Sequence, residues 1–254
     1  MTARGTLYLV PNGLDVGTTD VEADLGERLP LGTLRVAARL GHWVCENAKT
    51  TRAFLKRVDA VCALAGPLQQ IAIVELPRPP KGRPDIAAFD GERLLAPALA
   101  GSDLGLISEA GLPAVADPGA RLVAAAHGAG VRVVALPGAS SITLAVATSG
   151  LNGQSFAFVG YLPIEAEGRN ARIRELESTS RRLLQTQVMI ETPYRNPVLL
   201  GALLAQLHPA TVLSVSVGLT LANESTRSDS IERWRMSPGT LPADVPAVFS
   251  FLAR

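Results

Sequence analysis

Residues 106–141, LISEAGLPAVADPGARLVAAAHGAGVRVVALPGASS, contain the pattern that decides the fold. The apolar run LGLIS (104–108) predicts a buried strand, and the glycines and prolines after it predict a loop. GARLVAAAHGAG (119–130) predicts a helix that ends at glycine, and VRVVAL (131–136) predicts another strand. This order of strand, loop, helix and strand is typical of a parallel sheet with helical crossovers.

The same rhythm extends toward the N-terminus. GTLYLV (5–10) predicts a buried strand that stops at the turn signal Pro11-Asn12-Gly13. Ser140 or Ser141 is expected to cap the helix that follows Pro137-Gly138. The other elements expected in this half are helices at about 32–41, 47–57 and 86–100, an extended stretch at 42–46 and a proline-rich loop at 76–85.

The second half repeats the pattern with more polar helices. The expected strands are 156–162, 187–192, 212–219 and 245–253, and the expected helices are about 169–184, 196–207 and 229–235. The sequence therefore predicts an α/β protein of two α/β domains, residues 1–137 and 138–254. The cleft between the two domains is the expected ligand site.

Composition narrows the class of protein. The 254 residues include 24 basic and 23 acidic side chains, whereas a protein that binds long nucleic acid alone is normally more basic. Any RNA contact must therefore come from a local patch or from binding a preformed particle. Cys45 and Cys62 are expected to be reduced and buried. The three histidines lack metal-ligand spacing, so no metal is expected. MTARGTLYLVP is too short for a signal peptide, and no apolar run reaches about 18 residues, which predicts a cytoplasmic protein without a membrane span.

The loop after LGLIS is the first candidate for chemistry. Ligands of open α/β sheets bind beyond the carboxyl ends of the strands, where this loop is expected. Gly111 would let a ligand approach the backbone, and Glu109 and Asp117 supply carboxylates for a cationic group such as a sulfonium. The alternative interpretation is a structural loop with solvated acids.

Residues 106–141 resemble the signature VSDAGTPxISDPGxxLV, followed by PGPSA, of the ribosomal-RNA 2′-O-methyltransferase branch of the tetrapyrrole-methylase superfamily. Glu109 stands in place of Asp, and Leu112 in place of Thr. GTLYLVPNGL, FAFVGYLP and VMIETPYRN resemble that branch's GTLYIVATPIGNL, FxFxGFLP and VFYESPHR, in the same order. VGLTLANES (217–225) shares only fragments with its RELTKxxE motif.

The resemblance implies two α/β domains that bind S-adenosyl-L-methionine (SAM) in the cleft between them, in a homodimer. Backbone groups and apolar walls would hold much of the cofactor, so no GxGxxG fingerprint is needed after the first strand. The cofactor-binding residues that it implies are Pro11, Ser108, Glu109, Ala110, Gly111, Val115, Ala116, Ser140, Glu191 and Thr192.

CENAKTTRAFL (45–55) resembles the branch's AEDTRHTRKLL only in part. Glu46 and Arg52 match, whereas Asn47 and Lys49 replace an aspartate and an arginine. The resemblance implies Glu46 as the catalytic base and Lys49 and Arg52 as substrate contacts, although a lysine at 49 does not offer the planar fork with which arginine binds phosphate. The alternative interpretation is a helix N-terminus with Glu46 and Asn47 near the cap.

Five arginines lie on the predicted helix 169–184, at 169, 172, 174, 181 and 182. They form either a phosphate-binding stripe or a solvated face offset by Glu175 and Glu177, with Ile173, Leu176 and Leu183 directed inward. Arg195 follows ETPY and matches an arginine of the branch. It is therefore the better candidate for a substrate contact.

Three functions are consistent with these patterns. The first is a SAM-dependent methyltransferase that acts on an RNA ribose hydroxyl, with RNA or a ribosomal subunit as its partner. The second is a SAM-dependent methyltransferase for a tetrapyrrole or another small molecule, although those relatives have a shorter GDP-type loop in place of EAGLPAVADPG. The third is a SAM-binding interaction protein without catalysis, which the altered CENAK segment would permit.

Overall fold

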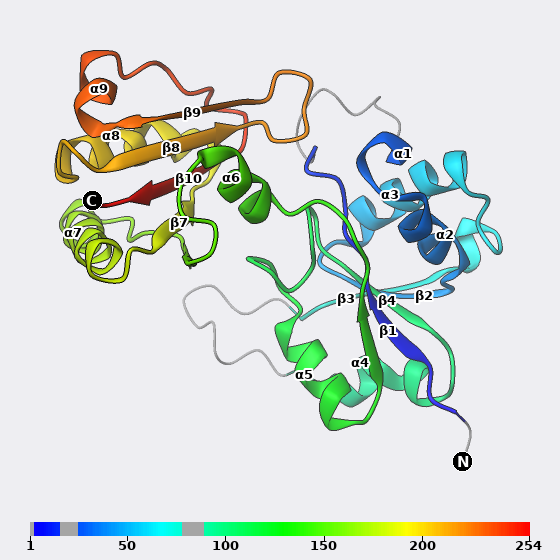
Figure 1. Ribbon diagram of the computed structural model, residues 1–254. Coiled ribbons are helices and arrows are strands. Elements are labelled where there is room, and N and C mark those ends of the chain that lie inside the picture. The colour runs from blue at the N-terminus through cyan, green and yellow to red at the C-terminus, as the bar shows by residue number, and fades with distance from the viewer. Residues whose placement is uncertain (1–2, 16–24, 78–88) are drawn as a thin grey trace. The chain divides into compact units, whose positions relative to one another are not determined.

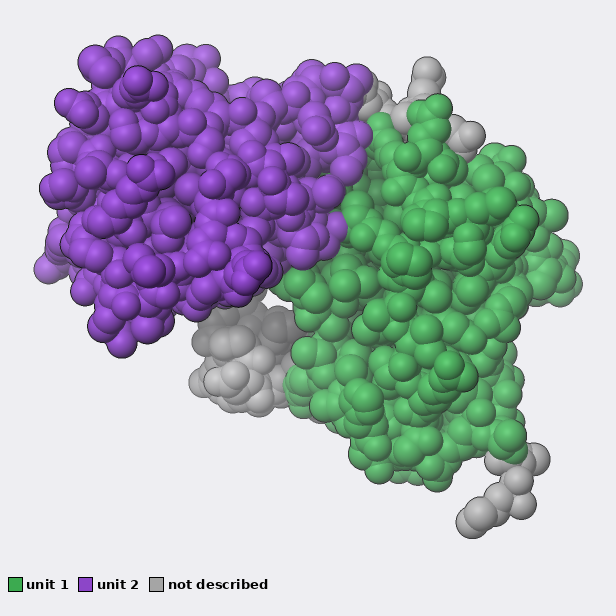
Figure 2. Space-filling model, viewed as in Figure 1, with its two compact units in different colours: residues 1–16, 21–139 green, residues 17–20, 140–254 purple. Residues whose placement is uncertain are grey.

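The computed structural model describes residues 3–15, 25–77 and 89–254 (Figure 1). It divides into two units: unit 1 contains the described residues up to Ala139, and unit 2 runs from Ser140 to Arg254 (Figure 2). Each unit is built on a five-stranded sheet with helices. The predicted α/β class with two α/β parts is therefore confirmed. The chain passes from unit 1 to unit 2 near the predicted boundary at Pro137-Gly138.

The sheet of unit 1 is entirely parallel. Its strands lie in the order β3-β2-β4-β1-β5. They are β1 (Thr6–Leu9), β2 (His42–Cys45), β3 (Ala72–Glu75), β4 (Leu104–Ile107) and β5 (Arg132–Ala135). Because all five strands point the same way, the loops that follow β1, β2 and β4 emerge at one edge of the sheet.

Helices cover both faces of this sheet (Figure 1). On β4, Leu104 and Leu106 pack with α4 and α5, whereas Ile107 packs with the cluster of α1, α2 and α3, as the two-residue period of a strand requires. Gly105 faces Trp43, and a Cβ there would lie 2.7 Å from Cε3 of that ring. The helices are α1 (Leu25–Arg28), α2 (Leu31–Arg39), α3 (Ala48–Val61), α4 (Gly91–Leu99) and α5 (Ala120–Gly128), with a 3-10 turn η1 (Leu68–Gln70).

The sheet of unit 2 is mixed, with the order β6-β7-β10-β8-β9. Only β6 and β7 are parallel, and the remaining pairs are antiparallel. The strands are β6 (Phe156–Gly160), β7 (Thr186–Ile190), β8 (Val212–Val217), β9 (Ser225–Ser230) and β10 (Ala247–Leu252). The chain turns back after β8 through a connection that is too short for a crossover helix, so β8 and β9 pair antiparallel.

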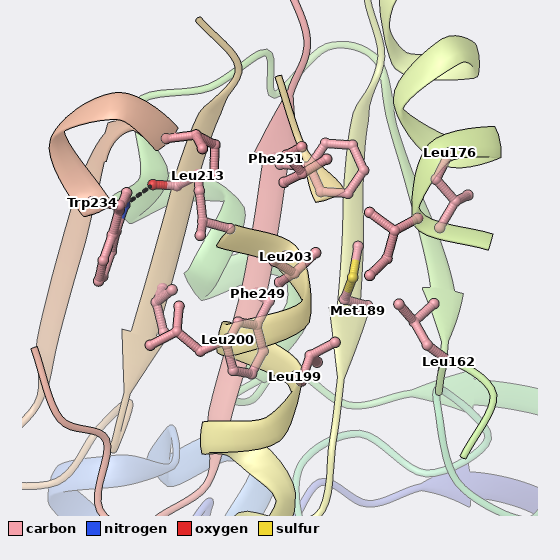
Figure 3. Packing of buried hydrophobic residues seen from close by; sticks show 14 of the residues in the cluster. Leu162, Leu176, Met189, Leu199, Leu200, Leu203, Leu213, Trp234, Phe249 and Phe251 are labelled. Carbon is pink, nitrogen blue, oxygen red and sulfur yellow. Dashed lines mark hydrogen bonds between the residues drawn. The ribbon is translucent and has the colours of Figure 1, made fainter. Parts of the chain in front are cut away.

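The core of unit 2 lies on one face of its sheet (Figure 3). Leu213 of β8 and Phe249 and Phe251 of β10 point into it, and Trp234 donates a hydrogen bond from Nε1 to the carbonyl of Leu213 at 2.9 Å. Alternate positions, such as Ser250, lie on the face that α6 contacts. The helices are α6 (Ser141–Ser149), α7 (Ala166–Leu183), α8 (Asn196–Gln206) and α9 (Ile231–Met236), with a 3-10 turn η2 (Pro193–Arg195).

Helix α7 corrects several predictions. Ile173 and Leu176 are buried as expected, but Leu183 is 47% exposed because Leu184 ends the helix in the left-handed conformation. Arg169 is buried and donates to the carbonyl of Ile164 at 2.7 Å, so it belongs neither to a stripe nor to a solvated face.

Glu177, predicted on the solvated face of α7, is also buried. Its Oε1 accepts hydrogen bonds from the backbone of His208 at 2.8 Å and from the hydroxyl of Thr211 at 2.5 Å. The buried carboxylate therefore joins α7 to the turn before β8.

The expectations for the cysteines and for Ser140 are confirmed in part. Both thiols are free, as predicted. Cys45 is buried, and its burial raises the pKa of its thiol. Cys62, which was also expected to be buried, is partly exposed. Ser140 lies at the N-cap of α6, but its side chain makes no capping hydrogen bond. The predicted loop 76–85 and the start of the predicted helix 86–100 lie mostly outside the described residues.

Candidate active site

The candidate site in unit 1 begins where the loops after β1 and β4 meet. The backbone N–H of Asn12 donates to the carbonyl of Gly111 at 2.9 Å, and its side-chain amide donates to the carbonyl of Glu109 at 2.9 Å. Asn12 is only 5% exposed, so these bonds are shielded from water. A single asparagine therefore fixes the β1 loop against a turn 97 positions further along the chain.

The loop after β4 is held in conformations that L-residues rarely adopt. Gly111 has φ 65°, and Ala114 and Ala116 have φ 66° and 62°. A non-glycine residue in this region costs about 1 kcal/mol or more, and such strain clusters at binding sites. The loop that the sequence singled out is therefore more than a solvated connection.

Glu46 and Glu109 meet beside this loop. The backbone N–H of Glu109 donates to Oε2 of Glu46 at 3.2 Å. Asn47 donates from its side-chain amide to Oε1 of Glu109 at 3.0 Å, and the hydroxyl of Thr50 lies 3.5 Å from the same oxygen. The segments after β2 and β4 thus present one half-buried carboxylate each at the end of the parallel sheet.

Asn47 also begins helix α3. It is the N-cap, and its side-chain oxygen accepts the backbone N–H of Lys49 at 2.9 Å. The predicted cap is confirmed, and the amide at this position uses its oxygen for the helix and its nitrogen for Glu109. An aspartate at 47 would place a carboxylate against that of Glu109 and remove the donor, so the asparagine suits the neighbouring glutamate.

Asp117 adds a third carboxyl group to the cluster. Its pKa is raised from 3.8 to about 6, mainly by burial. A hydrogen bond with Ser108 lowers the pKa, and the negative charges of Glu46 and Glu109 contribute to the rise. Perturbed carboxyl groups of this kind are typical of functional sites. The three neighbouring carboxyl groups of Glu46, Glu109 and Asp117 suit a cationic ligand.

A second polar cluster anchors the β1 loop. Asp15 is 2% exposed and forms ion pairs with Arg28 at 2.5 Å and Arg57 at 2.8 Å. The two arginines come from α1 and α3, so this pairing ties the loop to both helices. Its role is to support the loop that contains Asn12.

The carboxyl ends of β7 and β8 form the corresponding edge in unit 2. Oε1 of Glu191 accepts the backbone N–H of Thr192 at 2.9 Å, and Oε2 pairs with Arg195 at 3.2 Å. After β8, Thr220 has φ 70° and a buried hydroxyl without a partner among the described residues. The backbone N–H of Gly218 donates to the carbonyl of Pro246, which brings the segment before β10 to the same place.

The structure brings some predicted site residues together and leaves others apart. Ser108, Glu109, Ala110 and Gly111 form one turn with Glu46 beside it. Pro11 is buried, and a Cβ on Gly138 would lie 2.2 Å from its ring, so this proline packs on the loop after β5. The remaining predicted residues of unit 1, which are exposed on the β4 loop or on α3, are Val115, Ala116, Lys49 and Arg52.

In unit 2, Glu191, Thr192 and Arg195 lie together, whereas Ser140 begins α6. The pairing of Glu191 with Arg195 joins a predicted cofactor contact to a predicted substrate contact. Arg195 is 17% exposed in this pair.

Sequence reasoning missed Asn12, Asn47 and Thr220 as site residues. The sequence predicts Asn12 as a turn residue, and nothing in the local pattern predicts its bond to Glu109. The sequence predicts Asn47 either as the replacement of an aspartate or as a residue near the helix cap, but not its second bond, to Glu109. Thr220 gave no signal, because its orphaned hydroxyl follows from the backbone conformation.

Two cavities within the units lie away from these residues. One of about 400 Å³ in unit 2 is lined by Thr143, Val146, Ala147, Gly150, Leu151, Gly153 and Phe156. One of about 170 Å³ in unit 1 is lined by Arg35, Ala38, Arg39, Cys62, Ala63 and Ala65. Among the described residues there is neither a cluster of acids, histidines and cysteines suited to a metal ion nor a helix long and apolar enough to cross a membrane.

The parallel sheet, the strained loop after β4 and the carboxylates beside it place the chain in a known class. The family model for tetrapyrrole (corrin/porphyrin) methylases matches residues 45–233, which is more than half of the chain. The chain therefore belongs to the tetrapyrrole methylase family, as its motifs predict.

Its curated relatives agree on the branch within that family. A protein of Mesorhizobium japonicum named ribosomal RNA small subunit methyltransferase I is 35% identical over 141 residues, which are 56% of this chain and 47% of that protein. The protein of the same name from Pseudomonas aeruginosa is 37% identical over 106 residues, 42% of this chain and 36% of the relative. The matched segments span about half the length of these relatives, or less, and confirm the predicted resemblance to this branch.

Solved structures agree with the fold. A uroporphyrin-III-C-methyltransferase from Thermus thermophilus has a TM-score of 0.52 at 22% identity and covers 98% of this chain and 92% of its own. A conserved hypothetical protein from Aeropyrum pernix has a TM-score of 0.59 at 17% identity, over 99% of this chain and 85% of its own. At such identities the likeness concerns the fold alone.

Proposed function

We propose that the chain is a SAM-dependent methyltransferase that transfers a methyl group to a ribose hydroxyl of small-subunit ribosomal RNA. The observation that carries this proposal is the β4 loop, whose strained backbone is fixed to Asn12. The loop contains the carboxyl groups of Glu109 and Asp117, and Glu46 bonds to its backbone. The names of the curated relatives support the RNA substrate. A cytoplasmic location and a homodimer belong to the same proposal.

The residues present fit a cofactor that is cationic and rich in hydrogen-bonding groups. In unit 1 the acids near Ser108–Gly111 suit a sulfonium or an ammonium group, and Gly111 leaves the backbone accessible there. In unit 2 the buried, unpartnered hydroxyl of Thr220 is available to a polar ligand atom. The predicted contacts Pro11, Val115, Ala116, Ser140, Glu191 and Thr192 remain part of the proposal.

In the proposed reaction the protein has two tasks: it positions the ribose hydroxyl against the methyl group, and it accepts one proton. Bound SAM supplies an electrophilic methyl group on sulfur. Attack by the ribose oxygen on this methyl carbon would break the carbon–sulfur bond and release the demethylated cofactor, and the carboxylate of Glu46 would accept the hydroxyl proton. Glu46 is held by its contact with the backbone of Glu109, which limits its motion during this transfer.

Labelled methyl transfer tests the proposal. The purified chain is incubated with methyl-labelled SAM and, separately, with small ribosomal subunits that lack this methylation, free ribosomal RNA and a uroporphyrinogen. Label should enter the RNA at a ribose. The variant Glu46→Gln should transfer roughly 100-fold more slowly, as expected for removal of a general base.

Glu92→Gln is the matched control, because Glu92 is exposed on α4, on the other face of the same sheet. Its rate should equal that of the unaltered chain. Label in the porphyrinoid instead of the RNA would support the small-molecule alternative. SAM binding without any transfer would support the non-catalytic one.

A further inference from the structure

Helix α3 presents a row of cations on one face. Lys49, Arg52 and Lys56 are all exposed, and their spacing of three and four residues places them within about 60° around the helix. The buried residues of α3, such as Phe54 and Val58, lie on the opposite side and pack into the core. The row extends about 10 Å along the axis, at about 1.5 Å per residue.

These three cations are not neutralised by the described part of the chain. Within residues 3–15, 25–77 and 89–254, no ion pair involves Lys49, Arg52 or Lys56. The only described contact of their charged ends is a hydrogen bond of 3.3 Å from Arg52 to the carbonyl of Ala48, within the helix itself. Their charge is therefore available to a partner.

The arginines of α7 behave differently, although the sequence gives both helices a basic character. Arg172 pairs with Glu175 at 2.7 Å, and Arg174 donates to Gln206 at 2.6 Å. Arg181 donates to the carbonyl of Arg254 at 3.2 Å, and Arg169 is buried. Most of the basic groups of α7 are thus already engaged in unit 2.

We infer that the phosphate backbone of the RNA substrate lies along the exposed face of α3 and contacts Lys49, Arg52 and Lys56. This inference rests on the proposed function and names Lys56 as a contact that neither the motif nor the relatives assign. Ala53 is exposed beside the cations, and its small side chain lets a backbone approach closely. The row ends before the exposed Asp59, whose Oδ1 accepts the backbone N–H of Leu64 at 2.9 Å.

The row of cations lies beside the acidic residues of the candidate site, where it can offset their repulsion of phosphate groups. Helix α3 begins directly after Glu46 and Asn47, so the row leads away from the carboxylates of Glu46 and Glu109. Those acids repel a phosphate backbone, and the net charge of +1 for the whole chain does not compensate for them. A local row of cations beside the acids attracts RNA while the acids remain near the acceptor ribose.

A backbone contact predicts a defined dependence on salt. Each phosphate contact on single-stranded nucleic acid contributes about 0.7 to the slope of log affinity against log salt concentration. Three contacts therefore contribute roughly 2 to this slope. Removal of one cation should weaken binding about equally for every RNA sequence.

Fluorescence anisotropy with a labelled single-stranded RNA, between about 50 and 200 mM salt, measures this slope. Lys56→Ala should reduce it by about 0.7, and the triple change of Lys49, Arg52 and Lys56 to alanine by about 2. Arg93→Ala is the matched control, because Arg93 is an exposed cation on α4 without an ion pair in the described chain. It should leave the slope unchanged.

Two further measurements distinguish the loss of an RNA contact from misfolding and from a loss of SAM binding. Circular dichroism verifies that each variant is folded, and calorimetry with SAM should give the same affinity for Lys56→Ala as for the unaltered chain. An unchanged slope in the triple variant would overturn the inference while leaving the proposed SAM chemistry intact. Equal affinity for an acidic peptide of the same charge would also overturn it, because the row would then serve a protein partner.

Discussion

The two sheet edges hold their acidic residues in different ways. In unit 1, Glu109 is bound by Asn47 and by the backbone contact to Glu46, so groups from distant parts of the chain converge. In unit 2, Glu191 bonds only to Thr192 and Arg195 among the described contacts, both within four residues. The first edge gathers carboxylates, whereas the second pairs its carboxylate with a cation.

This difference indicates that the edge of unit 1 contributes more to binding a cationic cofactor than the edge of unit 2 does. Burial raises the pKa of Asp117, the charges of Glu46 and Glu109 add to this rise, and a cationic ligand would stabilise the ionised carboxylates. A local ion pair gains little from such a ligand. Substitutions at the edge of unit 1 should therefore affect cofactor binding more than substitutions at the edge of unit 2.

The largest effect is expected at Gly111. Gly111→Ala places a methyl group at φ 65°, 3.2 Å from Cδ2 of Leu14 and 3.4 Å from the carbonyl oxygen of Ala139, in the turn that is bonded to Asn12. The strain is about 1 to 2 kcal/mol, and the displaced turn should lower SAM affinity at least tenfold, or about 1.4 kcal/mol, in calorimetry.

Gly150→Ala provides the matched control for this prediction. Gly150 has φ 68° at the end of α6, and an added Cβ would meet nothing within 4 Å. Its free energy of unfolding should fall by a similar 1 to 2 kcal/mol while its SAM affinity stays unchanged. Equal decreases of affinity in both variants would remove the special role of the Gly111 turn.

A smaller effect is expected from Glu191→Gln in unit 2. The change removes the charge that pairs with Arg195 but keeps an oxygen that can accept the N–H of Thr192. Because the change keeps the hydrogen bond to Thr192 and leaves the carboxylate cluster of unit 1 intact, SAM affinity should fall by no more than roughly fivefold, or about 1 kcal/mol. A larger decrease in Glu191→Gln than in Gly111→Ala would reverse the comparison of the two edges.

The smallest effect is a dependence of stability on pH at Asp117. Its folded pKa of about 6 exceeds the ordinary 3.8, so its ionised form destabilises the fold. The penalty is absent below about pH 4, grows between pH 4 and 6, and is complete above pH 6. Asp117→Asn should therefore increase the free energy of unfolding by about 1 kcal/mol at pH 7.5, after allowance for solvent screening, and by almost nothing at pH 4.

Urea denaturation at the two pH values measures this difference. Asn and Asp have nearly the same size, so packing is preserved. A gain at pH 4 that equals the gain at pH 7.5 would mean that charge is not the cause.

The sequence predicted those parts of the fold that depend on local pattern. The run LGLIS predicted β4 because both alternating faces of that strand are apolar. β9 (Ser225–Ser230) was missed because STRSDS has no apolar alternation, and it is a strand only through its pairing with β8. β3 (Ala72–Glu75) lies at the sheet edge and is mostly exposed, so it gave an equally poor signal.

The site was predictable to the extent that single segments define it. The turn Ser108–Gly111 and Glu46 were found from the sequence, and the structure places them side by side. The bond from Asn12 to Glu109 and the two roles of Asn47 depend on which loops meet, which no local pattern contains. The surroundings of the arginines of α7 could not be predicted for the same reason, because Arg174 and Arg181 bond to residues elsewhere in the chain.

Calorimetric titration of the purified chain with SAM is the most direct test of this account. We expect saturable binding of one SAM per chain, with an affinity that falls in Gly111→Ala and persists in Gly150→Ala. If the folded chain gave no binding heat with SAM or with its demethylated product, the assignment of the β4 loop as a cofactor site would be contradicted.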